Sequence, residues 1–353
     1  MSRFRPEDLR KLGEELFAAV GVPPAEAELV ADHLVESGLL GHDSHSVLRY
    51  PQYVNMVRDG AVLPGAPLEV RRATPCLAQA SGNWNFGPVT ATAAMRLALE
   101  LSQQAALSAV AVEQCNHVAR LGRFAAMAAR ENRIALILAN GHGGDLAVAP
   151  FGGAARRLPT NPLCAALPTG RPWPLVLDMT TSMTSGGALR LHRNLQTPVP
   201  PGQIIDAQGR PTEDVEAYYG PPPGSALPLG FPLAGHKGFG LAVIIDILAG
   251  ALSGAGCSRA GPAPVGNALF IAVLDIAAFT PLERFLQETG QFIDWIRSCP
   301  PAAGFEEVLL PGEKAWRTSQ ERQRRGLEVD DTAWGQISRL AAELNVALPA
   351  PLS

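Results

Sequence analysis

The sequence predicts an α/β fold: a mixed sheet, not of the Rossmann type, flanked by helices and preceded by an N-terminal helical region. Residues 107–115 and 133–140 have strand patterns on either side of a helical segment at 119–132, which is a β-α-β arrangement. Apolar runs at 241–252 and 269–274 suit buried core elements. The glycine fingerprint GxGxxG is absent, so a dinucleotide would bind without the common Rossmann motif.

The composition is that of a well-buried globular chain. Of its 353 residues, 47% are hydrophobic, and the net charge is −4. This charge gives no electrostatic reason to bind nucleic acid or an anionic membrane surface. Both apolar runs are shorter than the roughly 18 to 20 residues that span a bilayer. We therefore expect no nucleic-acid partner and no membrane partner.

The cysteines and histidines show no ligand or disulfide spacing. The five cysteines lie far apart without a CxxC pair, which argues against a disulfide framework and fits a reducing cytosol. The seven histidines show no HxxxH or HxH pattern. The first residues, MSRFRPEDLRKLGEELF, lack the apolar core of a signal peptide. We expect a cytoplasmic protein with no metal site.

The first part of the chain is predicted to be helical. Residues 6–20 and 24–40 read as helices, because each has a proline in its first turn, acids after it and a glycine at its end. Extended structure is expected near 68–80, followed by a helix that starts near Pro88. We therefore place an N-terminal helical region at 1–75.

The stretch GHDSHSVLRYPQY follows these two helices and carries the first candidate site. His45, Arg49 and Tyr53 are four residues apart, so an α-helix would place them on one face. A side chain that titrates near neutral pH, a carboxylate-binding guanidinium and a phenol complement one another chemically. Ser44 is a candidate N-cap, and Pro51 is expected to kink or restart the helix. A surface helix that carries these residues by chance is the alternative.

Asn116 and His117 directly follow the predicted strand 107–115. Open parallel sheets bind ligands at the carboxyl ends of their strands. His117 is therefore a candidate site residue. The alternative is that it caps the next helix together with Asn116.

Asp178 ends another predicted strand and precedes a run of threonine and serine residues. An acid at a strand end, followed by hydroxyl donors near a helix start, suits recognition of ribose and phosphate. An ordinary N-cap cluster uses the same residue types. Residues 191–235, rich in proline and glycine, are expected to form a loop-rich excursion over the sheet.

His236 and Lys237 stand among Gly235, Gly238 and Gly240, ahead of an apolar helix. Glycines let the backbone approach a ligand, and the lysine adds positive charge to the helix N-terminus, which already favours anions. A charged turn on a core helix would look similar.

The last part of the chain is again predicted to be helical, with helices from Thr280 and over 332–345. We place an α/β cofactor-binding core at 76–275, which includes the excursion at 191–235. A C-terminal helical region at 276–353 is expected to pack back on the N-terminal part.

Six stretches together resemble the malate/L-lactate dehydrogenase family, which is unrelated to the common Rossmann-type lactate and malate dehydrogenases. In chain order they are DSHSVLRYPQY, NHVARLGRFA, PTNPLCAALP, LDMTTS, GHKGFGLAVIIDILAGALSG and LPGE. The family includes ureidoglycolate dehydrogenase, sulfolactate dehydrogenase, diketogulonate reductase and piperideine- or pyrroline-2-carboxylate reductases. The matching stretches keep the family's order from near residue 8 to near residue 345.

The resemblance implies an oxidoreductase that uses NAD or NADP to interconvert a small 2-oxo acid and the matching 2-hydroxy acid. It also implies a homodimer with its active site near the subunit interface. By match to the family's motifs, His45 is the proton donor and acceptor, and His117 is a second catalytic candidate. The substrate-binding candidates are Ser44, Arg49 and Tyr53. The cofactor-binding candidates are Thr160, Asp178, Met179, Thr180, Thr181, Ser182, His236, Lys237, Gly312 and Glu313.

One departure from the family pattern bears on the substrate. Ser46 stands where the family has a glycine, and it adds a Cβ and a hydroxyl near the proposed proton donor. A reductase of a cyclic 2-carboxy imine is the alternative within the family, and a catalytically silent binding protein of the same fold is a third hypothesis. The sequence does not distinguish NAD from NADP.

Overall fold

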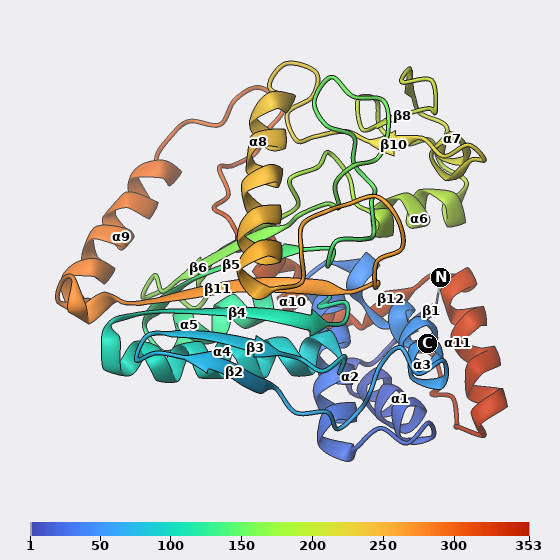
Figure 1. Cartoon of the computed structure of the whole chain (residues 1–353), viewed down its shortest axis with the longest axis horizontal. Coiled ribbons are helices and arrows are strands. Elements are labelled where there is room, and N and C mark those ends of the chain that lie inside the picture. The colour runs from blue at the N-terminus through green and yellow to red at the C-terminus, as the bar shows by residue number, and fades with distance from the viewer. Residues whose placement is uncertain (1, 353) are drawn as a thin grey trace.

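A computed structural model describes residues 2–352, and a seven-stranded mixed sheet lies at the centre of this part of the chain (Figure 1). The strand order is β2-β3-β4-β11-β5-β6-β7, and only β3 and β4 pair in parallel within it. The strands are β2 (Glu69–Ala73), β3 (Leu77–Ser81), β4 (Leu107–Cys115), β5 (Arg133–Asn140), β6 (Leu163–Leu167), β7 (Leu175–Met179) and β11 (Asn267–Asp275). The mixed, non-Rossmann sheet expected from the sequence is therefore present.

The predicted β-α-β unit is present with one difference. Strands β4 and β5, joined by α5 (Gly122–Arg130), run in the same direction, but β11 lies between them and pairs antiparallel with both. The carboxyl ends of β4 and β5 nevertheless lie at the same edge of the sheet, on either side of β11. This edge carries His117, just after β4.

Helices cover the two faces of the sheet unequally. The helices α4 (Gly87–Ala105) and α5 pack on one face, where small residues such as Ala91, Ala94 and Ala98 are fully buried and allow a close approach (Figure 1). The helix α8 (Gly235–Asp246), which continues into a π-helical turn at Ile247–Ala251, stands over the other face.

The two ends of the chain are tied together. Strand β1 (Ser2–Phe4) pairs antiparallel with β12 (Leu327–Val329). Three N-terminal helices share one buried core with the last helix. These helices are α1 (Pro6–Ala18), α2 (Pro24–Leu39), α3 (Tyr50–Arg58) and α11 (Asp331–Leu344).

Residues 191–235 contain more regular structure than the loops expected there. A small three-stranded sheet and a short helix follow α6 (Gly186–Leu195). Their elements are β8 (Ile204–Ile205), β9 (Pro211–Thr212), α7 (Val215–Tyr219) and β10 (Ser225–Ala226).

The two remaining helices are α9 (Leu282–Arg297), which stands away from the sheet in Figure 1, and α10 (Glu313–Arg325). Among residues 2–352, none of the helices combines the length and apolar character needed to cross a membrane.

Candidate active site

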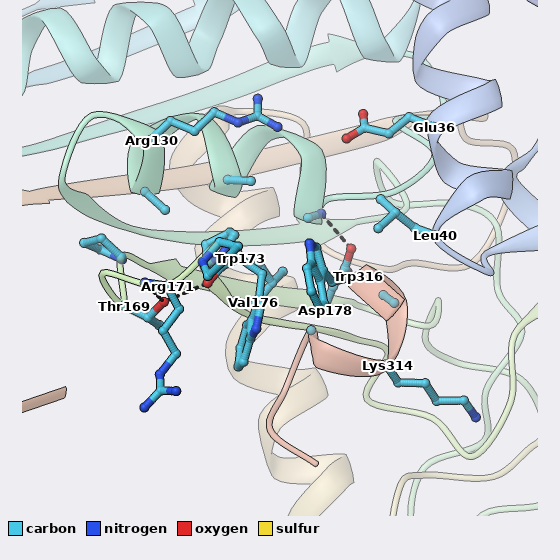
Figure 2. A pocket seen from close by; sticks show the side chains of 18 of the residues that line it. Glu36, Leu40, Arg130, Thr169, Arg171, Trp173, Val176, Asp178, Lys314 and Trp316 are labelled. Carbon is cyan, nitrogen blue, oxygen red and sulfur yellow. Dashed lines mark hydrogen bonds between the residues drawn. The ribbon is translucent and has the colours of Figure 1, made fainter. Parts of the chain in front are cut away.

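Two neighbouring cavities lie where the N-terminal helices meet the sheet. The inner cavity, of about 930 Å³, is lined by residues that include His45, Arg49, His117, Thr160 and Met179. The outer cavity, of about 850 Å³, is lined by residues that include Trp173, Val176, Asp178, Gly312 and Trp316 (Figure 2). His42, Arg120 and Asp178 line both cavities, so the two spaces meet at these side chains.

His45 and His117 face each other in the inner cavity. Their rings are nearly parallel, with centroids 5.6 Å apart and 14° between their planes. Nδ1 of His45 lies 2.9 Å from the Ser44 hydroxyl, which leaves Nε2 as the nitrogen available to a ligand. Burial, reinforced by the charge of Arg49, lowers the pKa of His45 to about 3. Both imidazoles are neutral at pH 7, because burial also holds the pKa of His117 well below its usual value.

Tyr53 is buried behind His117. Its hydroxyl lies 2.9 Å from His117 Nδ1 and donates a hydrogen bond of 3.0 Å to the His117 carbonyl oxygen. Burial raises the pKa of the phenol, so Tyr53 keeps its proton at pH 7. Tyr53 therefore holds the His117 ring in place.

Arg49 is buried but has one free end. Its Nε donates to the Ser44 carbonyl oxygen at 2.8 Å, and its Nη1 donates to Gln52 Oε1 at 2.5 Å. Within residues 2–352, Nη2 donates no hydrogen bond. The first turn of α6 approaches this atom, and a Cβ added to Gly187 would lie 3.3 Å from Nη2 and 2.7 Å from Ser44 Cβ. A glycine is therefore needed here for α6 to start beside Arg49.

The helix expected to carry His45, Arg49 and Tyr53, kinked or restarted at Pro51, is not formed as a single element, although α3 does start beside Pro51. His45 belongs to a 3-10 turn at Asp43–His45, Arg49 to a second at Val47–Arg49, and Tyr53 to α3. The break falls at Ser46, which has an extended backbone (φ −96°, ψ −158°), while Pro51 lies in the first turn of α3. Ser44 is therefore not the N-cap of this helix. The three side chains nevertheless reach one place.

Ser46 itself lines neither cavity within the described residues. Its side chain is buried, and a Cβ added to Gly38 of α2 would lie 2.3 Å from the Ser46 hydroxyl oxygen. The serine in place of the family glycine thus packs against α2, and within residues 2–352 its hydroxyl does not belong to the lining of the inner cavity.

The hydroxyl groups after Asp178 serve the backbone. Thr180 donates to the Ser182 carbonyl at 3.1 Å, Thr181 to the Thr160 carbonyl at 3.0 Å, and Ser182 to the Thr184 carbonyl at 2.6 Å. Their donor capacity is therefore used within the fold. Thr180 lines the inner cavity together with Met179 and Thr160.

Asp178 lies within β7 and caps another helix. Its Oδ2 accepts a hydrogen bond of 2.6 Å from the Gly122 amide at the start of α5 (Figure 2). Burial raises the pKa of this carboxyl, while Arg120 and the bond to Gly122 act against the rise.

Of the remaining predicted cofactor-binding residues, one lines a cavity and three do not within residues 2–352. Gly312 lines the outer cavity, whereas the buried Glu313 carboxylate accepts hydrogen bonds from Arg297 at 2.5 Å and Arg317 at 2.7 Å and so joins α9 to α10. His236 and Lys237 are exposed in the first turn of α8 and do not line either cavity within the single chain described over residues 2–352.

Asn161 and Arg120 line the cavities without having been predicted. The Asn161 side-chain nitrogen donates to the Ala242 carbonyl at 2.9 Å and to Asp246 at 3.0 Å, which leaves its buried Oδ1 without a partner among residues 2–352. Such an orphaned acceptor fits a ligand with an amide N–H₂ group. In the sequence, the only signal for Asn161 is its position next to Thr160. The only signal for Arg120 is its position three residues after His117.

The inner cavity is thus lined by two neutral imidazoles, which are able to exchange a proton, and by a buried arginine, a side-chain type able to bind a carboxylate. The model of the malate/L-lactate dehydrogenase family matches residues 4–338. The chain is 35% identical to an L-lactate dehydrogenase of Cupriavidus necator, over 96% of this chain and 97% of that protein. It is 32% identical to a malate dehydrogenase of Pyrococcus abyssi, over 98% and 95%.

A solved structure agrees with these relatives. The structure of a putative malate/lactate dehydrogenase from Escherichia coli superposes with a TM-score of 0.91 at 31% identity, covering 98% of this chain and 96% of that one. The chain belongs to the malate/L-lactate dehydrogenase family. The resemblance that the sequence motifs indicated is therefore confirmed, and 2-hydroxy acid dehydrogenase activity is supported at the level of the family.

Proposed function

We propose that this chain uses NAD or NADP to interconvert a small 2-hydroxy acid and its 2-oxo acid, with His45 as proton donor and acceptor. The observation that carries the proposal is the convergence of the His45 ring and the free Nη2 of Arg49 on one cavity. Relatives named L-lactate dehydrogenase and malate dehydrogenase, similar over nearly the whole chain, support the substrate class.

Each residue has a role that follows from its geometry. Nη2 of Arg49, helped by the N-terminus of α6, binds the substrate carboxylate and so orients C2. His45 is neutral at pH 7, so it can accept the hydroxyl proton when the alcohol is oxidised. A bound carboxylate offsets the charge of Arg49, which raises the pKa of His45 and helps it return the proton in the other direction.

The residues around the cavities fit a nicotinamide dinucleotide. Asn161, Thr160 and Met179 would hold the nicotinamide end, because Asn161 Oδ1 is an unused acceptor for a carboxamide. Asp178 and Gly312 would face the other half of the molecule from the outer cavity. When bound, the cofactor supplies or accepts the hydride at C2 of the substrate.

The decisive experiment is a substrate panel with both reduced cofactors. Turnover of pyruvate or oxaloacetate above that of a cyclic 2-carboxy imine is expected. Faster turnover of the imine would replace the proposal by the reductase alternative. If neither NADH nor NADPH binds, as measured by nicotinamide fluorescence, the proposal fails and a non-redox binding protein remains.

We also propose that the chain works as a homodimer. Large apolar side chains are exposed on α8 and its π-helical extension, namely Ile244 (56%) and Ile247 (47%), and on α9, namely Phe292 (57%) and Trp295 (74%). Exposed apolar patches of this kind mark protein interfaces, and α9 stands off the sheet where a second copy can pack (Figure 1). The cytoplasm is the proposed location, because the five cysteines are unpaired.

Sedimentation analysis tests the dimer. The wild-type chain should sediment as twice its own mass, and Ile244→Glu should shift it toward a monomer. A monomeric wild type at micromolar concentration would contradict the homodimer. The dimer contact also decides whether the exposed Lys237 comes near a cofactor.

A further inference from the structure

Arg120 is a buried arginine whose guanidinium donates no hydrogen bond in the part of the chain that the structure describes. Its side chain is 8% exposed, and its Nε is fully buried with no partner among these residues. Its one ion pair, with Glu36, has an N–O distance of 3.4 Å, and its side chain donates no hydrogen bond within residues 2–352. Burying a guanidinium costs free energy unless its N–H groups are bonded, so this group is poised for an anion from outside the chain.

Arg123, three residues later, differs from Arg120 because its guanidinium is bonded to acidic side chains of α2. Its Nη1 donates to Glu36 at 2.5 Å, and its Nη2 lies 2.8 Å from Asp32. Arg123 does not line either cavity in the described part of the chain. Arg123 therefore binds the carboxylates of Asp32 and Glu36 on α2, whereas Arg120 lines both cavities.

The backbone leaves room for the Arg120 guanidinium at the junction of the two cavities. A Cβ added to Gly122 would lie 2.5 Å from Arg120 Nη1 and 2.9 Å from Asp178 Oδ2. The glycine leaves room for both groups over the start of α5, although Arg120 and Asp178 form no ion pair within residues 2–352. Asp178 accepts a hydrogen bond from the Gly122 amide at the helix N-terminus, and the charge of Arg120 also acts against the rise that burial causes in the pKa of this carboxyl.

We infer that Arg120 binds the pyrophosphate of the dinucleotide cofactor, an inference that rests on the function proposed above. A nicotinamide dinucleotide has two bulky halves joined by a doubly charged bridge. The structure offers two cavities joined at a buried cation. With the nicotinamide half in the inner cavity, the bridge falls at the junction, where the planar guanidinium can bond two phosphate oxygens.

The test compares Arg120→Gln and Arg120→Lys with the matched control Arg123→Gln. Dissociation constants are measured for NADH and NADPH by nicotinamide fluorescence, and for ADP-ribose and adenosine by calorimetry. In Arg120→Gln, Kd for the reduced cofactor and for ADP-ribose should rise about 30-fold or more, because a hydrogen-bonded charge is lost. Kd for adenosine, which has no phosphate, should change less than about threefold.

The other two variants separate binding from folding. Arg120→Lys keeps the charge and loses the fork, so Kd for ADP-ribose should rise about fivefold. Arg123→Gln should lower Tm and leave every Kd within about twofold, because it removes only contacts inside the fold. Should Arg120→Gln fail to fold, Arg120→Lys carries the test with the same ligands.

The outcomes are distinguishable. A wild-type chain that binds neither NADH nor NADPH overturns the proposed function itself. If the wild type binds a cofactor and the Arg120 variants bind ADP-ribose equally well, this inference alone is wrong. Equal weakening of adenosine and ADP-ribose would assign Arg120 a structural role and would also overturn the inference.

Discussion

The Tyr53 hydroxyl donates to the carbonyl oxygen of His117 and lies 2.9 Å from Nδ1 of the same residue. A phenol has one proton, and a carbonyl can only accept, so this proton is committed to the carbonyl. Nδ1 of His117 must then carry the ring proton and donate to the phenol oxygen. Nε2 of His117 is left as an acceptor, on a ring that stacks with that of His45.

Replacing Tyr53 by Phe should release the ring of His117. Without the phenol oxygen, Nδ1 has no fixed partner, and both tautomers and ring orientations become accessible. We expect kcat to fall about tenfold, which corresponds to the loss of one hydrogen bond. Steady-state kinetics measure this, and an unchanged kcat would show that the ring orientation does not matter.

Replacing His45 by Ala should lower kcat by roughly two to four orders of magnitude, because the proton acceptor is lost. Cofactor affinity should stay nearly intact, since the ring contacts Ser44 and His117. His117→Ala is the comparison, because Nε2 of His117 can also accept a proton. If His117→Ala loses far more activity than His45→Ala, the base is His117.

Replacing Arg49 by Lys should raise KM for the substrate by roughly 10- to 100-fold with a smaller effect on kcat, because a lysine cannot reach Ser44, Gln52 and the substrate together. Kd for the reduced cofactor serves as the internal control. An unchanged KM would speak against the carboxylate contact.

The sequence predicted the side chains of this site better than the backbone that carries them. The four-residue spacing of His45, Arg49 and Tyr53 indicated one helix, kinked or restarted at Pro51, whereas the chain uses two 3-10 turns before α3 starts beside that proline. At the break, Ser46 packs against Gly38 of α2, a tertiary contact that no local pattern reveals. The types and spacing of the residues were enough to find the cluster.

Features that depend on distant pairing were not predictable. Strand β11 enters between β4 and β5 from more than a hundred residues downstream, so the local β-α-β pattern could not show it. The importance of Asn161 and Arg120 comes from burial without a partner, which exists only in the folded chain. The acid in LPGE matched a family motif, yet the Glu313 carboxylate binds two arginines of the chain itself.

Arg190 should affect the choice between substrates. It is exposed at the inner cavity, forms no ion pair within residues 2–352, and lies close enough to lower the pKa values of Arg49 and His117. A second acidic group on the substrate would face it. Arg190→Gln should lower kcat/KM for oxaloacetate about fivefold and leave that for pyruvate within about twofold.

The control for this substrate test is Arg157→Gln, which removes one positive charge from an exposed arginine that lies outside both cavities in the described chain. It should leave the ratio of the two kcat/KM values unchanged. Equal losses for oxaloacetate and pyruvate in Arg190→Gln would rule out a contact with a second acidic group.

The pH dependence of kcat/KM should differ from that of an ordinary histidine. Burial lowers the pKa of His45 to about 3, so the ring is neutral throughout the range from pH 8 to pH 5. Oxidation of the hydroxy acid needs the neutral ring, and its kcat/KM should therefore stay flat as the pH falls through 6.5. Reduction needs the protonated ring, whose fraction grows tenfold for each pH unit lost, so kcat/KM should rise toward acid pH.

Initial rates in both directions measure this pH dependence. A fall in the oxidation rate with an apparent pKa near 6.5, retained in His117→Ala, would place an ordinary solvated imidazole at His45 and contradict the enclosed site.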